Sequence, residues 1–137
     1  MSSLAVYILL DYRRVKRDRE QSAMPSQAER DHQRYAELKR AVADLGFIRR
    51  GSLIERFMPC GKPGCCCQAT PPQLHGPYYQ WTRKVRGKTV TVRLSETEAQ
   101  LFAEWIANGR RLDAIAAKLE SVSLRATERL RKKAQKS

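Results

Sequence analysis

Apolar residues recur along this chain at helical spacing in two stretches, and the segments between them have the pattern of strands. The first stretch runs from residue 28 to 45, where one face carries Tyr35, Leu38, Val42 and Leu45. Gaps of three and four residues predict a helix that turns this face to a core. Ser26 and Glu29 match a capping box at its start, and Gly46 is suited to end it.

Three strands are predicted next, over residues 52–58, 78–84 and 88–94. The first is bounded by Gly51 and Pro59. The other two flank a turn at Arg86-Gly87, where glycine makes a tight hairpin possible. In this register Tyr79, Trp81 and Arg83 lie opposite Leu94, Val92 and Val90, and we expect this largely apolar face to pack inward.

A long helix is predicted after residue 95, because Ser95 and Glu98 form a second capping box. Asn108-Gly109 interrupts its apolar pattern, and we expect a kink there. Spacings of seven indicate a coiled-coil-like seam, carried by Phe102, Trp105, Leu112, Leu119 and Ala126. From residue 110 onward there are nine basic and three acidic residues, so the helix ends in a basic tail.

These elements predict an α+β fold: an N-terminal helix, a three-stranded antiparallel β-meander with a Cys/His knuckle, and a long C-terminal helix. We expect one domain over residues 26–137. Residues 1–25 are interpreted as a dispensable or disordered extension. Their apolar segment, residues 4–10, is far shorter than the ~20 residues needed to span a bilayer. It also lacks the flanks of a signal peptide, which predicts a cytoplasmic protein with no membrane association.

All four cysteines and one of the two histidines fall within sixteen residues. Cys60, Cys65, Cys67 and His75 together could bind Zn²⁺, which takes tetrahedral sets of Cys and His ligands. Gly61, Pro63 and Gly64 would let the loop fold tightly. We expect Cys66 to be a spare, since adjacent residues rarely ligate one ion. Two alternatives stay open: a disulfide or redox centre, which a reducing cytoplasm disfavours, and a loop with free thiols.

Positive charge indicates a polyanionic partner. The chain carries 27 Lys and Arg against 14 Asp and Glu, for a net charge of +13, and such charge favours phosphate contacts. A two-stranded ribbon fits the major groove of DNA, and amide, hydroxyl and cationic side chains read its bases or grip phosphates. The candidate binding residues on the predicted hairpin are Gln80, Thr82, Lys84, Arg86, Lys88, Thr91 and Arg93. The alternative is a face that is polar for solubility and edge protection.

Several short motifs carry a family resemblance. They include Cys60-Gly-Lys with Cys65 and Cys67, His75-Gly-Pro-Tyr-Tyr79, and Trp105-Ile-Ala-Asn108. The chain resembles an uncharacterised family of small prokaryotic proteins, a domain of unknown function of which some members are encoded near mobile elements. The resemblance covers roughly residues 50–119, implies that the three cysteines and His75 are the family's polar signature, and brings no activity with it. A fold-level analogy links residues 78–106 to the arm-binding domains of phage-type integrases, which bind DNA with a three-stranded sheet.

The sequence therefore predicts a nucleic-acid-binding protein, with duplex DNA as partner, acting as a mobile-element accessory or small regulator. The main alternative is a protein–protein interaction module whose helical seam dimerises or recruits a partner. No paired catalytic carboxylates, phosphate-cradling glycine loop or catalytic triad occur, so an enzyme is not expected.

Overall fold

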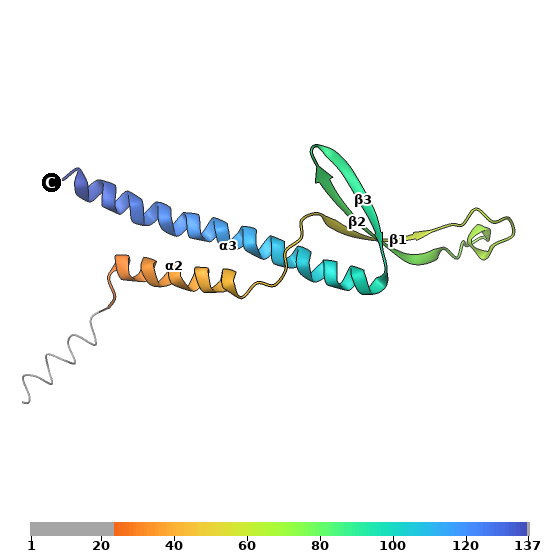
Figure 1. The fold of residues 1–137 in the computed structure, drawn as a ribbon, viewed down its shortest axis with the longest axis horizontal. Coiled ribbons are helices and arrows are strands. Elements are labelled where there is room, and N and C mark those ends of the chain that lie inside the picture. Colours follow the sequence, from red (N-terminus) through yellow and green to blue (C-terminus); the bar gives the residue numbers. More distant parts are fainter. Residues whose placement is uncertain (1–23, 137) are drawn as a thin grey trace, which may run out of the picture.

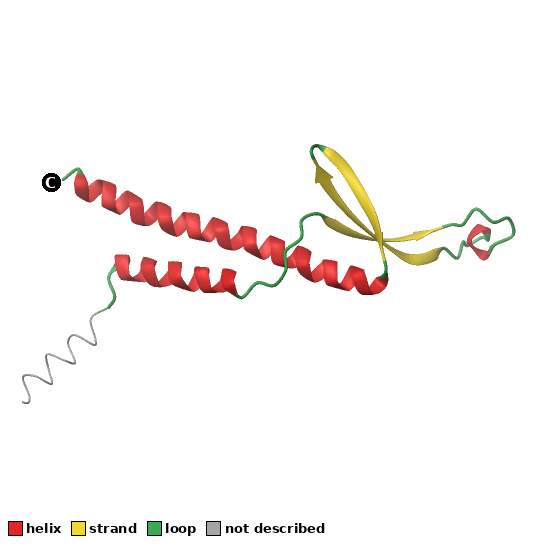
Figure 2. Cartoon of the chain, in the orientation of Figure 1, coloured by secondary structure: helices red, strands yellow, loops and turns green. Residues whose placement is uncertain are grey.

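The protein is described by a computed structural model that places residues 24–136. Its elements are α2 (Gln27–Ala43), β1 (Ser52–Met58), the short 3-10 helix η1 (Cys66–Gln68), β2 (His75–Val85), β3 (Lys88–Leu94) and α3 (Glu96–Ala134). The predicted α+β class and element order are confirmed (Figures 1 and 2). Apart from Met24 and Pro25, the predicted N-terminal extension lies outside the described residues. Among the helices of residues 24–136, none combines the length and hydropathy needed to cross a membrane.

The three strands form an antiparallel sheet in the order β1-β2-β3, and they overlap along a short central part. Residues 79–82 of β2 pair with both neighbours, whereas His75 and Tyr78 pair with β1 alone and residues 83–85 pair with β3 alone. Two two-stranded ribbons therefore extend from a common root in different directions (Figure 1). We call residues 56–78, with the cysteine loop at their tip, the knuckle arm, and residues 83–90 the hairpin arm.

Both predicted capping boxes are present. The Ser26 and Ser95 hydroxyls accept hydrogen bonds from the backbone N–H groups of Glu29 and Glu98, and the two glutamates accept from the serine N–H groups in return. Two predicted boundaries were wrong. Helix α2 ends at Ala43, three residues before Gly46, and β2 begins at His75 rather than at residue 78.

A small core lies where helix α3 crosses the root of the sheet. Trp81, Leu94 and Ile106 are buried there, with Leu53 and Phe102 packed against them. The prediction that the whole apolar face of the hairpin packs inward was wrong, since Val90 and Val92 are 37% and 41% exposed. Helix α3 crosses at the root, where Trp81 and Leu94 of this face are buried, whereas Val90 lies on the hairpin arm and Val92, although it pairs with Trp81, stays partly exposed (Figure 1).

Gly109 does not end or divide helix α3, which is one continuous element from Glu96 to Ala134. Its role is to admit a neighbouring chain segment: a Cβ at Gly109 would lie 2.6 Å from the carbonyl oxygen of Arg49. Beside it, the Asn108 side chain donates to the Phe47 carbonyl at 3.0 Å, and the Arg49 N–H donates to the Trp105 carbonyl at 3.0 Å. The position where a kink was expected is a docking point for residues 47–49.

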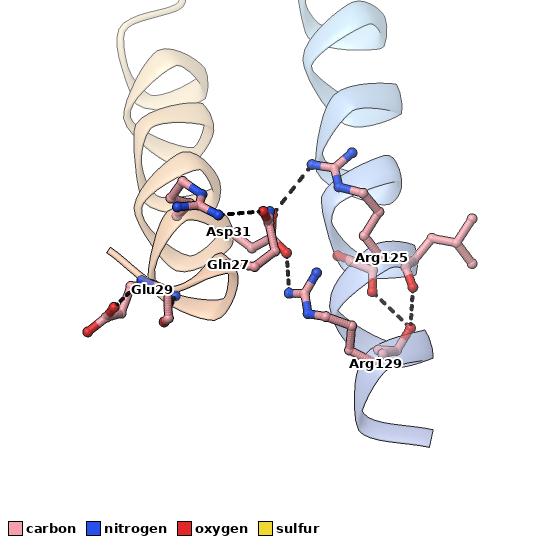
Figure 3. Close-up of polar contacts among 10 residues, drawn as sticks. Gln27, Glu29, Asp31, Arg125 and Arg129 are labelled. Atoms are coloured by element: carbon pink, nitrogen blue, oxygen red, sulfur yellow. Dashed lines mark hydrogen bonds and ion pairs between the residues drawn. The ribbon is translucent and has the colours of Figure 1, made fainter. Parts of the chain in front are cut away.

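Helix α2 packs against the C-terminal half of α3, as the predicted apolar stripe suggested (Figures 1 and 2). Asp31 of α2, 4% exposed, joins the two helices by ion pairs to Arg129 and, at 3.6 Å, to Arg125 (Figure 3). The Arg129 hydrogen bond, aided by Gln27 and the charge of Arg125, holds the pKa of Asp31 below its ordinary value. A charged contact therefore joins the first turns of α2 to the C-terminal part of α3.

Candidate metal centre and ribbon surface

The knuckle arm brings together the four residues expected to bind a metal. One potential ligand atom from each of Cys60, Cys65, Cys67 and His75 lies within 4.8 Å of the others. The Sγ atoms of Cys60 and Cys67 are 3.6 Å apart, and Cys65 Sγ is 3.1 Å from His75 Nε2. These four side chains can hold a metal ion together.

Local backbone geometry explains how His75 reaches the cysteines. Arg56 pairs with Tyr78 but Met58 pairs with His75, so β2 contains one residue more than β1 in this stretch. Such a bulge bends a strand and redirects its side chains. Gly76 lies in it with φ of 149°, and a Cβ there would come within 2.8 Å of the Arg56 carbonyl oxygen. The glycine after His75 is therefore needed for the turn of the strand toward the loop.

Hydrogen bonds already favour a thiolate within the cluster. The backbone N–H of Cys67, followed by the side chains of Cys60 and His75, lowers the pKa of Cys65 to about 6. The N–H of Cys60 also donates to Cys67 Sγ at 3.3 Å, but burial and the neighbouring thiols of Cys60 and Cys65 raise the pKa of Cys67 overall. Because metals bind the thiolate form of cysteine, the hydrogen bonds to Cys65 favour metal binding at that residue.

Cys66 differs from its three neighbours. It is exposed, it is not among the four converging residues, and its Sγ lies 4.0 Å from that of Cys65. The adjacent thiol of Cys65 raises the pKa of Cys66. The pKa of Cys65 is therefore lowered and that of Cys66 is raised, although the two residues are adjacent.

One face of the hairpin carries most of the predicted nucleic-acid-binding residues. Gln80 pairs with Arg93, Thr82 with Thr91, and Lys84 with Thr89. The hydroxyls of Thr82 and Thr91 lie 3.1 Å apart, and Lys84, Thr91 and Arg93 are exposed. Since paired residues of an antiparallel ribbon share a face, five of the seven candidates lie together: Gln80, Thr82, Lys84, Thr91 and Arg93.

The remaining two candidates are placed differently. Lys88 pairs with Val85, so it belongs to the opposite face, which also carries Trp81 and Val92. Arg86 occupies the turn itself with φ of 49°, followed by Gly87 at 79°. Positive φ at both central residues matches the turn that best suits a twisted hairpin. Lys88 is therefore not part of the polar face.

The polar face also includes residues that the sequence reasoning missed. Tyr78 lies on it, and the Arg93 guanidinium stacks 4.4 Å from its ring centroid. Arg56 of β1 pairs with Tyr78 and extends the same face across the sheet. The alternation of side chains along residues 52–58 indicates which of them share a face. The β1–β2 register was needed to show that the face of Arg56 is the polar face of the hairpin.

Comparisons with known proteins place the chain in one family. Searches of curated proteins and of solved structures found no significant match. A family model described as a domain of unknown function, DUF6788, matches residues 26–103. This span contains α2, the whole sheet and the beginning of α3, so it starts earlier and ends earlier than the resemblance over residues 50–119 suggested. More than half of the sequence is matched, and the chain belongs to this family of uncharacterised domains.

Proposed function

We propose that the protein binds duplex DNA through the polar face of its β2–β3 ribbon. The observation that carries this proposal is the register, which collects Gln80, Lys84 and Arg93 on a face that includes Thr82, Thr89 and Thr91. Residues 82–94 contain five basic and no acidic side chains. An amide can read base edges, while the cations contact phosphates and release counterions.

The shape of the sheet supports this assignment. The hairpin arm projects from the root, away from the helix pair (Figure 1). A two-stranded ribbon of this kind can enter the major groove. Arg93 is held beside Tyr78 at 4.4 Å, so its position is defined before DNA binds and less side-chain freedom is lost on binding.

We propose zinc as the ion of the knuckle arm, with a structural role. Three thiolates and one imidazole form a common zinc ligand set, and a tetrahedron with Zn–S bonds of ~2.3 Å places its ligands ~3.7 Å apart. The Cys60–Cys67 separation of 3.6 Å agrees with that value. The ion would close the loop between β1 and β2 and support the strand that carries Gln80.

A salt titration of duplex-DNA affinity tests the proposed interface. We expect Lys84→Ala and Arg93→Ala each to weaken binding and to reduce the slope of log affinity against log salt by roughly 0.9 per lost phosphate contact. Gln80→Ala should act on sequence discrimination instead, because an amide carries no charge.

Lys88→Ala is the matched control. Like Lys84→Ala it removes one positive charge from the β2–β3 ribbon, but from the opposite face. It should leave the slope close to that of the unaltered protein. Equal effects of Lys84→Ala and Lys88→Ala would reject the polar face as the contact surface. A dominant effect of Arg131→Ala and Lys132→Ala would assign binding to the end of α3, and absence of duplex binding would reject the function.

A further inference from the structure

The sheet has two faces, and helix α3 packs against one of them. Leu53 and Trp81 belong to the covered face, where they lie in the core with Ile106 of the helix. Side chains alternate between the two faces along a strand, so Ile54 and Gln80 lie on the other face. This second face is the polar face that carries the proposed DNA contacts, and it continues from the β2–β3 ribbon onto β1.

An exposed aliphatic side chain, Ile54, lies on this polar face. Ile54 of β1 pairs with Gln80 of β2, and Gln80 pairs in turn with Arg93 of β3. Residues paired in this way have Cβ atoms ~5 Å apart, so the three side chains form one row across the sheet. Ile54 is 38% exposed. An apolar group, an amide and a guanidinium therefore lie side by side on a surface that is open to a partner.

The major-groove edge of an A·T base pair presents groups that match two members of this row. Adenine offers N7 and N6, an acceptor and a donor with which one glutamine amide can pair, and thymine adds a methyl group that apolar side chains contact. A G·C pair has no methyl group there and a different set of polar groups. Gln80 and Ile54 together therefore complement an A·T pair better than a G·C pair.

We propose that Ile54 determines specificity by contacting the methyl group of a thymine beside the adenine that Gln80 reads. This inference rests on the proposed DNA binding by the polar face and extends the contact surface to β1. Strands ~4.8 Å apart place Ile54 and Arg93 ~10 Å from each other, which is within the ~12 Å width of the major groove. Arg56 is exposed on the same face of β1 and adds a cation beside Ile54 for phosphate contact.

Affinity measurements on three duplexes of equal length test the inference. The probes are an A·T-rich duplex, the same duplex with every thymine replaced by deoxyuridine, and a G·C-rich duplex. Deoxyuridine lacks only the methyl group. Its use should raise the dissociation constant of the unaltered protein about fourfold, which is the effect expected for one buried methyl group. The G·C-rich duplex should bind about tenfold more weakly than the A·T-rich duplex.

Variants of the row separate its two contributions. Ile54→Ala should bind the thymine and deoxyuridine duplexes alike, whereas Gln80→Ala should keep the difference between them, because Ile54 is retained. Phe57→Ala is the matched control. Phe57 is an exposed apolar residue of the same strand, but alternation places it on the opposite face, so the thymine preference should remain. Far-UV circular dichroism should show the same helix and strand content in all three variants.

The outcomes distinguish this inference from the proposed function. Equal affinity of the unaltered protein for thymine and deoxyuridine duplexes would overturn the role of Ile54 and leave salt-dependent contact through Lys84 and Arg93 intact. A thymine preference that persists unchanged in Ile54→Ala, or that is lost equally in Phe57→Ala, would also overturn it. Failure to bind any of the three duplexes at low salt would reject DNA binding itself and the inference with it.

Discussion

The two arms of the sheet differ in how their tips are held. The knuckle arm closes over sixteen residues between Met58 and His75, whereas the hairpin arm closes over Arg86 and Gly87 alone. Neither arm has a substantial apolar core, since Phe57 is 53% exposed in one and Val90 is 37% exposed in the other. Because the entropy of closure grows with loop length, the long loop needs a cross-link that the two-residue turn does not.

The same comparison separates two kinds of function. The knuckle arm gathers soft ligands around a point, and its tip contains Lys62 as its one charged side chain between residues 59 and 74. The hairpin arm has no comparable cluster but carries cations along a strand pair. This difference supports our proposals of a structural role for the first arm and of contact with a partner for the second.

Removal of the metal should produce the largest difference between the arms. We expect Cys65→Ser to abolish binding of about one zinc per chain and to release the knuckle arm, because structural zinc contributes folding free energy. Zinc content and amide hydrogen exchange on the full chain would measure this. Cys66→Ser is the control and should retain the ion. Exchange rates that rise equally in both arms would contradict the idea that the cross-link acts on the knuckle arm.

Two glycine substitutions, one in each arm, should lower the free energy of unfolding by different amounts, and we expect this difference to be smaller than the effect of metal removal. Gly76→Ala combines an unfavourable φ with a contact of 2.8 Å to the Arg56 carbonyl oxygen, and we expect a loss of about 2–3 kcal/mol. Gly87→Ala, with φ of 79° but open space around its Cβ position, should lose about 1 kcal/mol. Urea unfolding of the two variants checks the order. A larger loss for Gly87→Ala would show that the hairpin turn is the more tightly constrained tip.

Asp31→Asn changes a residue of the helix pair, so we expect it to have the smallest effect on the stability of either arm. In the folded protein the pKa of Asp31 is lowered from 3.8, chiefly by the Arg129 hydrogen bond. The ion pair therefore stabilises the fold at neutral pH, and this contribution is lost as pH falls through the lowered pKa. Thermal unfolding should show that the unaltered protein loses its advantage over Asp31→Asn on acidification. An advantage that persists below that pKa would contradict the assigned role of the ion pair.

Local signals accounted for much of the fold and of the candidate site. The capping boxes at Ser26 and Ser95 and the Arg86-Gly87 turn depend on residues a few positions apart, and each forms as predicted. The convergence of Cys60, Cys65, Cys67 and His75 was also anticipated from their closeness in sequence. The start of β2 was missed because the bulge at Gly76 depends on pairing with β1.

By itself the sequence determined the element order, the hairpin register and the grouping of the soft ligands, because neighbouring residues and strict alternation govern all three. Only the tertiary structure decided that Gly109 receives the Arg49 carbonyl, and that Val90 and Val92 remain partly exposed. It also decided that Asp31 meets Arg129, 98 residues away. These features depend on where separate elements cross in space. The position of such a crossing produces no periodic pattern in the sequence of either element.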